Sequence, residues 1–349
     1  MKTEIYEIRC VDSEAAQNAL ARAGDILRRG GLVVFPTETV YGLGADATDA
    51  TAASRIYTAK GRPSDNPLIV HVEAPEDAQK YAVTNEVYDR LATAFMPGPL
   101  TVIMPVKPTI PSTVTAGLST VAVRCPSHPV ARALLCAAGV PIAAPSANLS
   151  GSPSPTCARH VAEDMMGRVD MILDGGDSEI GLESTIVKIE EDGSLTLLRP
   201  GAVTPSMLME IVPELHIADA VLAALPEGQT VLSPGMKYRH YAPKTTFILL
   251  DGTREQITAY AKKRKGKIGI LCYKEDFDFF STYFPADQCI IWGKREDTRE
   301  QAKRLFTLLR EMDKLSFDCI FAPLPPREEM GMALYNRMIR AAAHQIVHL

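Results

Sequence analysis

Short apolar runs alternate with amphipathic stretches along the first two thirds of the chain. The run at 31–35, GLVVF, ends at Pro36, which has no N–H for a strand ladder, so it predicts a strand buried on both faces. A short strand and then a helix, capped by Asp12 or Ser13, are expected between residues 5 and 29. Further strands are expected at 68–72, 100–106, 121–123, 141–144, 169–173, 186–189 and 195–198, and further helices at 49–59, 76–82, 85–95, 129–138 and 205–211.

The pattern changes at residue 246, after which strands and helices alternate regularly. Strands are expected at 247–250, 268–271, 289–292 and 319–322, and helices at 255–263, 298–312 and 329–343. Strands separated by helices of this length are typical of a parallel, Rossmann-like layered domain. The region contains no phosphate-binding glycine fingerprint, so its residues alone do not indicate a function.

The length of the chain favours two domains, because 349 residues are many for a single core. We expect a first domain at 1–212, an interdomain linker at 213–245 and a second domain at 246–349. The linker contains the stretch SPGMKYRHYAPK at 233–244, which is more patterned than a plain tether. One reading of this stretch is a linker whose tyrosines pack on either domain.

Polar residues follow the ends of several predicted strands. After the strand GLVVF comes a turn closed by Gly42 and Gly44, whose missing side chains would let backbone amides approach a ligand. Because open α/β sheets bind ligands outside the carboxyl ends of their strands, we expect the polar loops at 145–156, 174–185 and 199–201 to share one edge with this turn. The polar residues of the turn and of the first loop are Thr37, Glu38, Thr39, Tyr41, Ser146, Asn148, Ser150, Ser152 and Ser154.

Four cations accompany these loops. Lys60 and Arg62 occupy a loop stiffened by two prolines, and Arg124 and Arg199 each follow a predicted strand. Together they predict a polar, partly cationic cleft. A plainer reading also stands, because Lys and Arg are mostly solvated and the Ser, Pro, Asn and Gly residues at 145–156 are also common in simple loops.

Two short motifs have readings that compete with this cleft. Residues 42–47 match the G-x-G-x-x-A of dinucleotide folds, but six residues separate the preceding strand from the first glycine, and two nearby aspartates would face a pyrophosphate. His71 with Glu73 resembles the H-x-E of zinc deaminases, yet no P-C-x-x-C follows. The alternative for His71 is a packed, hydrogen-bonded residue within a strand.

Composition limits the class of protein. No apolar run approaches the ~20 residues of a membrane helix, and the first ten residues, MKTEIYEIRC, do not resemble a signal peptide. The net charge of -5 gives no global reason to bind nucleic acid. An odd number of cysteines without any C-x-x-C argues against a disulfide framework and against zinc, and favours a reducing, cytoplasmic compartment. The seven are Cys10, Cys125, Cys136, Cys157, Cys272, Cys289 and Cys319.

Several motifs carry a resemblance to a known family. PTETVYGLG, K-G-R-P with NPLIVHV, PGPLT, AVRCP, PSANLSGSPSPT, ESTIV and LRPG, in this order and spacing, resemble the Sua5/YrdC/YwlC family of threonylcarbamoyl-AMP synthases. SPGMKYRHYAPK and the region after it are similar to the long Sua5 form. The resemblance implies an α/β fold, with a YrdC-like twisted open mixed sheet and helices around a concave cleft, plus a smaller Rossmann-like C-terminal domain. For that second domain it implies a lid or regulatory role.

The resemblance also implies a reaction and partners. An enzyme of this family joins L-threonine, bicarbonate and ATP into L-threonylcarbamoyl adenylate and pyrophosphate, the first step toward the t6A modification next to the anticodon of tRNAs. The product is expected to pass to the tRNA threonylcarbamoyl transferase machinery, while direct binding of tRNA is left open. Mg²⁺ is expected to arrive with ATP, held mostly by phosphates and water, and its protein ligands are unknown.

The reaction fits the residue types. Attack of a carbamate oxygen on the α-phosphorus depends on positioning and charge neutralisation, and the chain has no Walker motif, kinase set or nucleophile elbow. The resemblance implies that Lys60 and Arg62 are catalytic, and Arg124 suits the threonine carboxylate by type. The implied ATP-binding residues are Lys60, Arg62, Ser64, Thr120, Ser146, Asn148, Ser154, Arg199 and Tyr241, the last from a linker folded back over the nucleotide. The implied threonine-binding residues are Thr37, His71, Arg124, Ala144 and Ser184.

Two other classes of function remain open from the residues alone. An RNA-binding module would use the cationic cleft for phosphates, although RNA readers usually interleave aromatic and basic residues, and this cleft offers mainly hydroxyls and amides. A nucleotide hydrolase or NAD-dependent enzyme is the other alternative. Dependence of the reaction on threonine separates the synthase from both.

Overall fold

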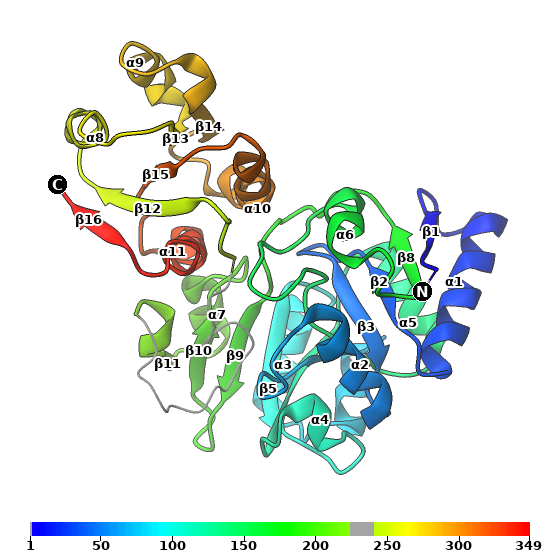
Figure 1. Cartoon of the computed structure of the whole chain (residues 1–349). Coiled ribbons are helices and arrows are strands. Elements are labelled where there is room, and N and C mark those ends of the chain that lie inside the picture. Colours follow the sequence, from blue (N-terminus) through cyan, green and yellow to red (C-terminus); the bar gives the residue numbers. More distant parts are fainter. Residues whose placement is uncertain (1, 224–240) are drawn as a thin grey trace. The chain divides into compact units, whose positions relative to one another are not determined.

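The computed structural model describes residues 2–223 and 241–349 and divides into two compact units (Figure 1). Within the described residues, the first unit holds 2–150 and 154–221, and the second holds 241–349 with the short segments 151–153 and 222–223. Among the helices of these residues, none combines the length and the apolar character that a membrane crossing needs.

The first unit is built on one mixed sheet, to which the described residues contribute eleven strands in the order β1-β8-β2-β3-β7-β4-β6-β5-β9-β10-β11. Five neighbouring pairs are parallel, namely β1–β8, β2–β8, β4–β6, β5–β9 and β10–β11. The strands are β1 (Glu4–Glu7), β2 (Val33–Phe35), β3 (Gly42–Asp46), β4 (Ile69–His71), β5 (Leu100–Pro105), β6 (Thr120–Arg124), β7 (Ile142–Ala144), β8 (Met171–Asp174), β9 (Thr185–Ile189), β10 (Leu195–Arg199) and β11 (Leu215–Ile217).

The directions of these strands correct one expectation from the sequence. β2 is antiparallel to β3, and β3 to β7, so β2, β7 and β8 run the same way and their following loops share an edge, as expected. β4 is antiparallel to β7 and parallel to β6, so both run the opposite way, and β10 does too. Arg124 and Arg199 therefore end strands that point away from the edge that carries Thr37, because apolar patterns carry no information on strand direction.

Most helices expected in the first unit are present, but the one expected at 76–82 is a 3₁₀ turn, and the helices at 112–115 and 158–165 were not predicted. Ser13, rather than Asp12, caps the first helix by accepting from the N–H of Ala16, and Asp49 caps the second. α1 and α5 pack through small and branched residues such as Leu20 and Leu134 in one core cluster. The helices are α1 (Glu14–Arg28), α2 (Ala50–Lys60), α3 (Glu86–Phe95), α4 (Ser112–Thr115), α5 (Pro129–Ala138), α6 (Ala158–Met165) and α7 (Pro205–Ile211), with 3₁₀ turns η1 (Pro75–Lys80) and η2 (Asp219–Val221).

The expected turn at Gly42 and Gly44 is wrong, because both glycines lie inside strand β3. A Cβ at Gly44 would lie 2.9 Å from Cε1 of Phe35 and 2.7 Å from Cγ2 of Ile142, and one at Gly42 would lie 3.1 Å from Cζ of Phe35. These glycines therefore make room for the Phe35 ring rather than for a ligand. Across β3 and β7, that ring meets the ring of His71 edge to face, with 5.9 Å between centroids.

The second unit has the parallel, Rossmann-like architecture predicted for it. Its five described strands follow the order β14-β13-β15-β12-β16, and every neighbouring pair is parallel. The strands are β12 (Thr246–Asp251), β13 (Ile268–Tyr273), β14 (Cys289–Gly293), β15 (Cys319–Pro323) and β16 (Ile346–His348). The helices are α8 (Arg254–Ala261), α9 (Phe277–Ser281), α10 (Thr298–Lys314) and α11 (Glu329–Ala341), with 3₁₀ turns η3 (Lys274–Asp276) and η4 (Ala286–Gln288).

The stretch between the two predicted domains starts later than expected. Residues 215–221, assigned to the linker from the sequence, form β11 and η2 of the first unit. The patterned stretch at 233–244 lies for the most part outside the described residues. Its described end includes Tyr241, which is buried in the second unit and stacks on Phe306 with 5.2 Å between ring centroids.

Candidate active site

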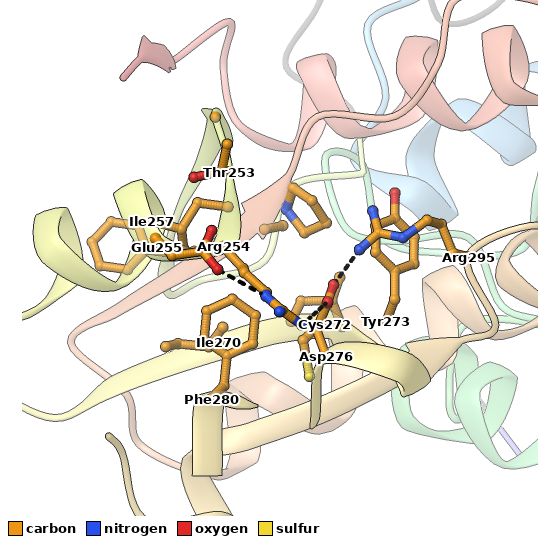
Figure 2. A pocket seen from close by; sticks show the side chains of 15 residues that line it. Thr253, Arg254, Glu255, Ile257, Ile270, Cys272, Tyr273, Asp276, Phe280 and Arg295 are labelled. Atoms are coloured by element: carbon orange, nitrogen blue, oxygen red, sulfur yellow. Dashed lines mark hydrogen bonds and ion pairs between the residues drawn. The ribbon is translucent and has the colours of Figure 1, made fainter. Parts of the chain in front are cut away.

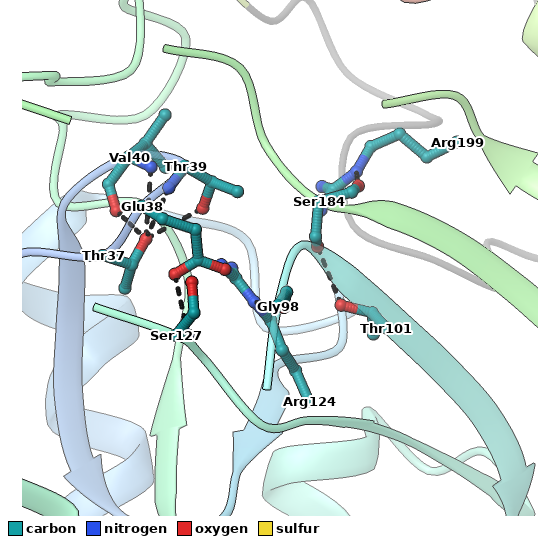
Figure 3. Close-up of polar contacts among 10 residues, drawn as sticks. All are labelled: Thr37, Glu38, Thr39, Val40, Gly98, Thr101, Arg124, Ser127, Ser184 and Arg199. Carbon is teal, nitrogen blue, oxygen red and sulfur yellow. Dashed lines mark hydrogen bonds and ion pairs between the residues drawn. The ribbon is translucent and has the colours of Figure 1, made fainter. Parts of the chain in front are cut away.

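The loop between β2 and β3 is folded by one hydroxyl. Thr37 Oγ1 donates to the carbonyl of Val40 at 2.6 Å and accepts the N–H groups of Thr39 and Val40 at 3.2 Å each (Figure 3). The hydroxyls of Thr37 and Thr39 are also 2.8 Å apart. Such side-chain bonds to the local backbone stabilise a tight turn in place of a ladder. This turn holds Glu38 in a buried position.

Glu38 forms a buried ion pair with Arg124. Its Oε1 lies 2.6 Å from Nη2 of Arg124, and the two side chains are 6% and 5% exposed (Figure 3). Oε2 accepts the N–H of Ser127 at 3.2 Å, and Nε of Arg124 donates to the carbonyl of Gly98 at 3.4 Å. Burial by itself raises the pKa of Glu38, but the charge and hydrogen bond of Arg124 outweigh burial and bring the pKa below its usual value. The carboxylate therefore stays ionised.

Arg124 keeps one end of its guanidinium open. Among the described residues, Nη1 has no hydrogen-bond partner, whereas Nε and Nη2 are engaged by Gly98 and Glu38. A guanidinium presents its donors in a rigid fork, so the engaged atoms fix the direction of the open one. Sequence reasoning assigned a role to Arg124 but none to Glu38. The signal was a carboxylate between two threonines, which when buried requires a cationic partner.

His71 is the neighbour of Arg124 in the sheet, because β4 and β6 pair them in register. Its Nδ1 lies 3.1 Å from the carbonyl of Ile69 and 3.3 Å from that of Ile142. Carbonyls only accept, so Nδ1 carries the proton and Nε2 is an acceptor. Burial, and secondly the charge of Arg124, lower the pKa of His71 to about 3, so the ring is neutral at physiological pH. Among the described residues, no three or more His, Cys, Asp or Glu side chains lie so that they could hold a metal ion.

Ser184 links the end of β10 to β5. Its hydroxyl lies 2.7 Å from that of Thr101, and Arg199 donates from Nε to the carbonyl of Ser184 at 3.0 Å and from Nη2 to its hydroxyl at 3.1 Å (Figure 3). All three side chains are buried. The N–H of Thr185, next to Ser184, donates to the carbonyl of Pro99, next to Gly98, at 2.9 Å. Arg199 and Arg124 therefore bond to two backbone segments that are joined by this hydrogen bond.

Lys60 ties the end of α2 to the loop after β7. Its Nζ donates to the carbonyl of Ser146, to that of Asn148 at 2.6 Å and to Oδ1 of Asn148 at 3.3 Å, and the residue is only 2% exposed. Arg62 holds its own loop, with Nη2 at 3.3 Å from the carbonyl of Asn66 and 3.2 Å from that of Pro67. Lys60 and Arg62 thus contact backbone carbonyls of the loops in which we expect phosphate to bind.

Backbone bonds join this cationic group to the Thr37 turn. The N–H of Ala147 donates to the carbonyl of Tyr41 at 2.8 Å, and the N–H of Leu43 donates to that of Pro145 at 2.9 Å. The hydroxyl of Tyr41 donates to the carbonyl of Gly176 at 2.7 Å, which also fixes the loop after β8. The loops after β2, β7 and β8 therefore form one hydrogen-bonded cluster, as their shared edge predicts.

The remaining candidates lie in different surroundings. Ser154 is buried and donates to Glu183, and Ala144 is the buried last residue of β7. Ser64 is exposed on the loop after α2, and Thr120 begins β6, at the end opposite Arg124. Tyr241 belongs to the second unit. Among the phosphate candidates, Ser146 and Asn148 contact Lys60, whereas Arg199 contacts the threonine candidate Ser184. The phosphate candidates therefore do not form one group around Lys60.

Comparisons with known proteins identify the family of the chain. The Sua5/YciO/YrdC family model, described as telomere recombination, matches residues 25–201, and the model described as threonylcarbamoyl-AMP synthase, C-terminal domain, matches 203–343. The chain is 41% identical to the threonylcarbamoyl-AMP synthase of Pyrococcus abyssi over 93% of this chain and 94% of the relative, and 40% identical to that of Bacillus subtilis over 99% and 100%. A crystal structure of P. abyssi Sua5 complexed with L-threonine matches with a TM-score of 0.89 at 38% identity and covers 100% of both chains. The chain therefore belongs to the Sua5/YrdC/YwlC family of threonylcarbamoyl-AMP synthases, in the long form with the Sua5 C-terminal domain.

Proposed function

We propose that this enzyme joins L-threonine, bicarbonate and ATP to give threonylcarbamoyl-AMP and pyrophosphate. The observation that carries the proposal is the buried Arg124, whose Nη1 stays open beside the neutral ring of His71. The pair offers a cation for a carboxylate and an uncharged acceptor for an ammonium or hydroxyl, which are the groups of a small hydroxy amino acid. The L-threonine complex of P. abyssi Sua5 supports this choice of substrate.

Threonine would bind with its carboxylate on Nη1 of Arg124. Glu38 holds the guanidinium from the other side and, being ionised, attracts the substrate ammonium while keeping the fork oriented. Nε2 of His71 would accept from the ammonium or the side-chain hydroxyl. Thr37, Ser184 and the backbone at Ala144 complete the set that we assign to threonine.

ATP would bind where cations and neutral donors face the loops after α2 and β7. We assign the triphosphate to Lys60, Arg62 and Arg199, which would exchange some of their carbonyl and hydroxyl partners for phosphate oxygens. Neutral contacts would come from Ser64, Thr120, Ser146, Asn148 and Ser154, and a lid contact from Tyr241. Ammonium, guanidinium, hydroxyl and amide groups suit phosphates rather than a metal, so Mg²⁺ would travel on the phosphates of ATP and on water.

The chemistry asks little of a protein nucleophile. The threonine amine and bicarbonate give a carbamate and water, the carbamate oxygen attacks the α-phosphorus, and the bond to the leaving pyrophosphate breaks. Positioning and charge neutralisation account for most catalysis in phosphoryl transfers. The adenylate would then pass to a tRNA threonylcarbamoyl transferase for t6A formation, in the cytoplasm as the cysteine pattern leads us to expect.

The test is the substrate requirement of pyrophosphate release. ATP should yield pyrophosphate only when L-threonine and bicarbonate are both present, and the adenylate should appear in equal amount by mass spectrometry. Omitting either substrate is the control. Release of phosphate or pyrophosphate from ATP alone would indicate a nucleotide hydrolase and contradict the proposal.

A further inference from the structure

The second unit contains a cavity of about 340 Å³ at the carboxyl edge of its parallel sheet (Figure 2). Gly252, Tyr273 and Pro323, at the ends of β12, β13 and β15, line it, and these three strands are neighbours in the sheet. This volume falls within the range of ~300–1,000 Å³ that is usual for small-molecule sites. The cavity is therefore large enough for a ligand, and none of the described residues of the first unit lines it.

The position in the topology is the one where open parallel sheets bind ligands. β15 and β12 are neighbours at the middle of the sheet. The chain leaves β12 through α8 toward β13, which lies beyond β15, and leaves β15 through α11 toward β16, which lies beyond β12. Adjacent strands whose connections leave in opposite directions open a crevice at their carboxyl ends. The cavity lies at this crevice between β12 and β15.

One wall of the cavity is apolar. Ile257 from α8, Ile270 from β13, Phe280 from α9 and Phe321 from β15 line it, and all four belong to one core cluster of the second unit. Packing on the core holds these side chains in place, so the wall exists before a ligand arrives. It suits a flat aromatic or aliphatic group.

The opposite wall is cationic. Arg254 and Arg295 converge on the carboxylate of Asp276, with Nη1 of Arg254 at 3.6 Å from Oδ1 and Nη2 of Arg295 in contact with Oδ2 (Figure 2). Both guanidinium groups also lie over aromatic rings, Arg254 at 4.5 Å from the centroid of Phe279 and Arg295 at 4.4 Å from that of Tyr273. These contacts orient the two cations toward the same point at the mouth of the cavity.

The charges at the mouth leave room for an anion. Two guanidinium groups share the one buried carboxylate of Asp276, whose side chain is 9% exposed. Glu255 also lines the cavity and pairs with Nε of Arg254 at 3.0 Å, but both side chains are about half exposed, so solvent screens this pair and it holds Arg254 only weakly. The start of α8 adds a helix terminus that favours negative charge.

We propose that this cavity binds a small organic anion with an aromatic or apolar body. The carboxylate or phosphate of the ligand would sit between Arg254 and Arg295, and its body would pack on Ile257 and Phe280. Such a ligand combines the two walls, whereas a bare inorganic ion or an uncharged aromatic molecule would use only one of them. The site is separate from the threonine and ATP residues and does not depend on the reaction proposed for them.

The only tryptophan of the sequence reports on this cavity. Trp292 stacks on Tyr273 with 5.8 Å between ring centroids and 19° between planes, and Tyr273 lines the cavity beneath Arg295. We would titrate the full chain with AMP and with 3-phenylpropionate, and follow the fluorescence of Trp292. Two matched probes serve as controls: adenosine lacks the anionic group, and inorganic phosphate lacks the aromatic body. A saturable change with AMP indicates a phosphate ligand, and one with 3-phenylpropionate a carboxylate ligand.

Variants separate this cavity from other sites. Arg254→Gln and Arg295→Gln should each raise the Kd of the bound probe at least tenfold, while both proteins keep the unfolding midpoint of the parent because these side chains are about half exposed. Arg264→Gln is the control, since Arg264 also lies over a ring, Tyr260, but does not line the cavity. Lys60→Ala should leave the Kd unchanged, because Lys60 belongs to the first unit.

Three results would overturn the proposal. They are no saturable change of Trp292 fluorescence with either anion, binding of adenosine as tight as that of AMP, and equal Kd values for the parent and both cavity variants. Loss of probe binding in Lys60→Ala would also count against it, because the fluorescence change would then come from the first unit.

Discussion

We expect Glu38 to contribute to threonine binding by holding Arg124, whose guanidinium would bind the substrate carboxylate. In Glu38→Gln the buried guanidinium loses its counter-charge, which at comparable sites costs about 3–5 kcal/mol of unfolding free energy. We also expect the KM for threonine to rise more than the KM for ATP, because the fork is no longer oriented. Urea unfolding and pyrophosphate release measure the two effects. Glu4→Gln is the control, since its pair with Arg22 is partly exposed and should be worth less than ~1 kcal/mol.

Arg124→Lys tests the carboxylate role directly. Lysine keeps the charge but cannot donate in a fork to Glu38 and to a second carboxylate at once. The threonine concentration needed for half-maximal rate should therefore rise while ATP affinity stays near that of the parent. Calorimetry with each substrate distinguishes them, and a loss of ATP affinity with unchanged threonine affinity would show the roles to be reversed.

Lys60→Ala and Arg62→Ala test the phosphate role. If these cations stabilise charge on the reacting phosphates, either change should lower the rate of pyrophosphate release by roughly 10² to 10³. Circular dichroism should show folded protein in both cases. Lys80→Ala is the control and should leave the rate unchanged, because Lys80 is an exposed lysine paired with Asp77 on the surface. Near-parental turnover of both active-site variants would remove Lys60 and Arg62 from the mechanism.

His71 should make folding stability depend on pH. The pKa of His71 falls from 6.5 to about 3 on folding, so between these values the unfolded chain binds a proton that the folded chain does not. Stability therefore decreases as pH falls through this window. From pH 6 to pH 5 the free energy of unfolding should fall by roughly 1 kcal/mol because of His71, and the His71→Asn variant should not show this part of the decrease. Equal losses in the two proteins, measured by urea unfolding, would mean that His71 is not the titrating group.

At the scale of the element, the glycines of β3 determine how the sheet packs. Gly44→Ala places a Cβ at 2.9 Å from the Phe35 ring, and overpacking of this kind costs about 1–3 kcal/mol. Thermal unfolding should show the loss. In a Phe35→Leu background the same change should cost less, because the ring has gone, and a strictly additive double mutant would contradict the contact.

The sequence predicted helices well where a proline marks the first turn. Pro129–Ala138 and Pro205–Ile211 start at a proline in the first turn, and both helices have the expected bounds. β3, with the sequence GLGAD, was missed because it contains a single large apolar residue and its glycines favoured a turn. Its strand conformation comes from pairing with β2 and β7, which local patterns do not contain.

The site was predictable in its residue types and less so in its contacts. Polar residues at strand ends predicted that the loops of Thr37, Ser146 and Asn148 share one edge, and these loops do lie on one edge. The pairing of Glu38 with Arg124 joins residues 86 positions apart, and nothing in the local sequence of either one specifies the other. Charge pairs of this kind follow from the sheet order, which the sequence does not give.

At the scale of the whole molecule, each unit has its own core, so a chain ending near Val231 should fold. That position lies outside the described residues, and the segment at 233–244 stays a predicted lid. If the lid closes over nucleotide, the shortened chain should unfold cooperatively yet make little adenylate, because an open site lets water reach the mixed anhydride.

The full chain offers a second measurement of the same prediction. Added together, ATP and threonine should protect residues 233–244 from protease more than either does alone. If the segment is cleaved equally fast in every mixture, or if the shortened chain is fully active, residues 233–244 are a plain interdomain linker and not a lid.

The register of the outermost strand has a consequence for biosynthesis. β1 pairs only with β8 among the described strands, Glu4 with Met171, and β8 in turn pairs with β2. A ribosome adding ~5–20 residues per second takes about 10–30 s to travel between those two positions. Throughout that interval the nascent chain carries strand edges whose partner has not been made, whereas β12 to β16 all come from one contiguous, later stretch. We therefore expect translation of the first unit to benefit from chaperones that keep these early edges apart from other nascent chains.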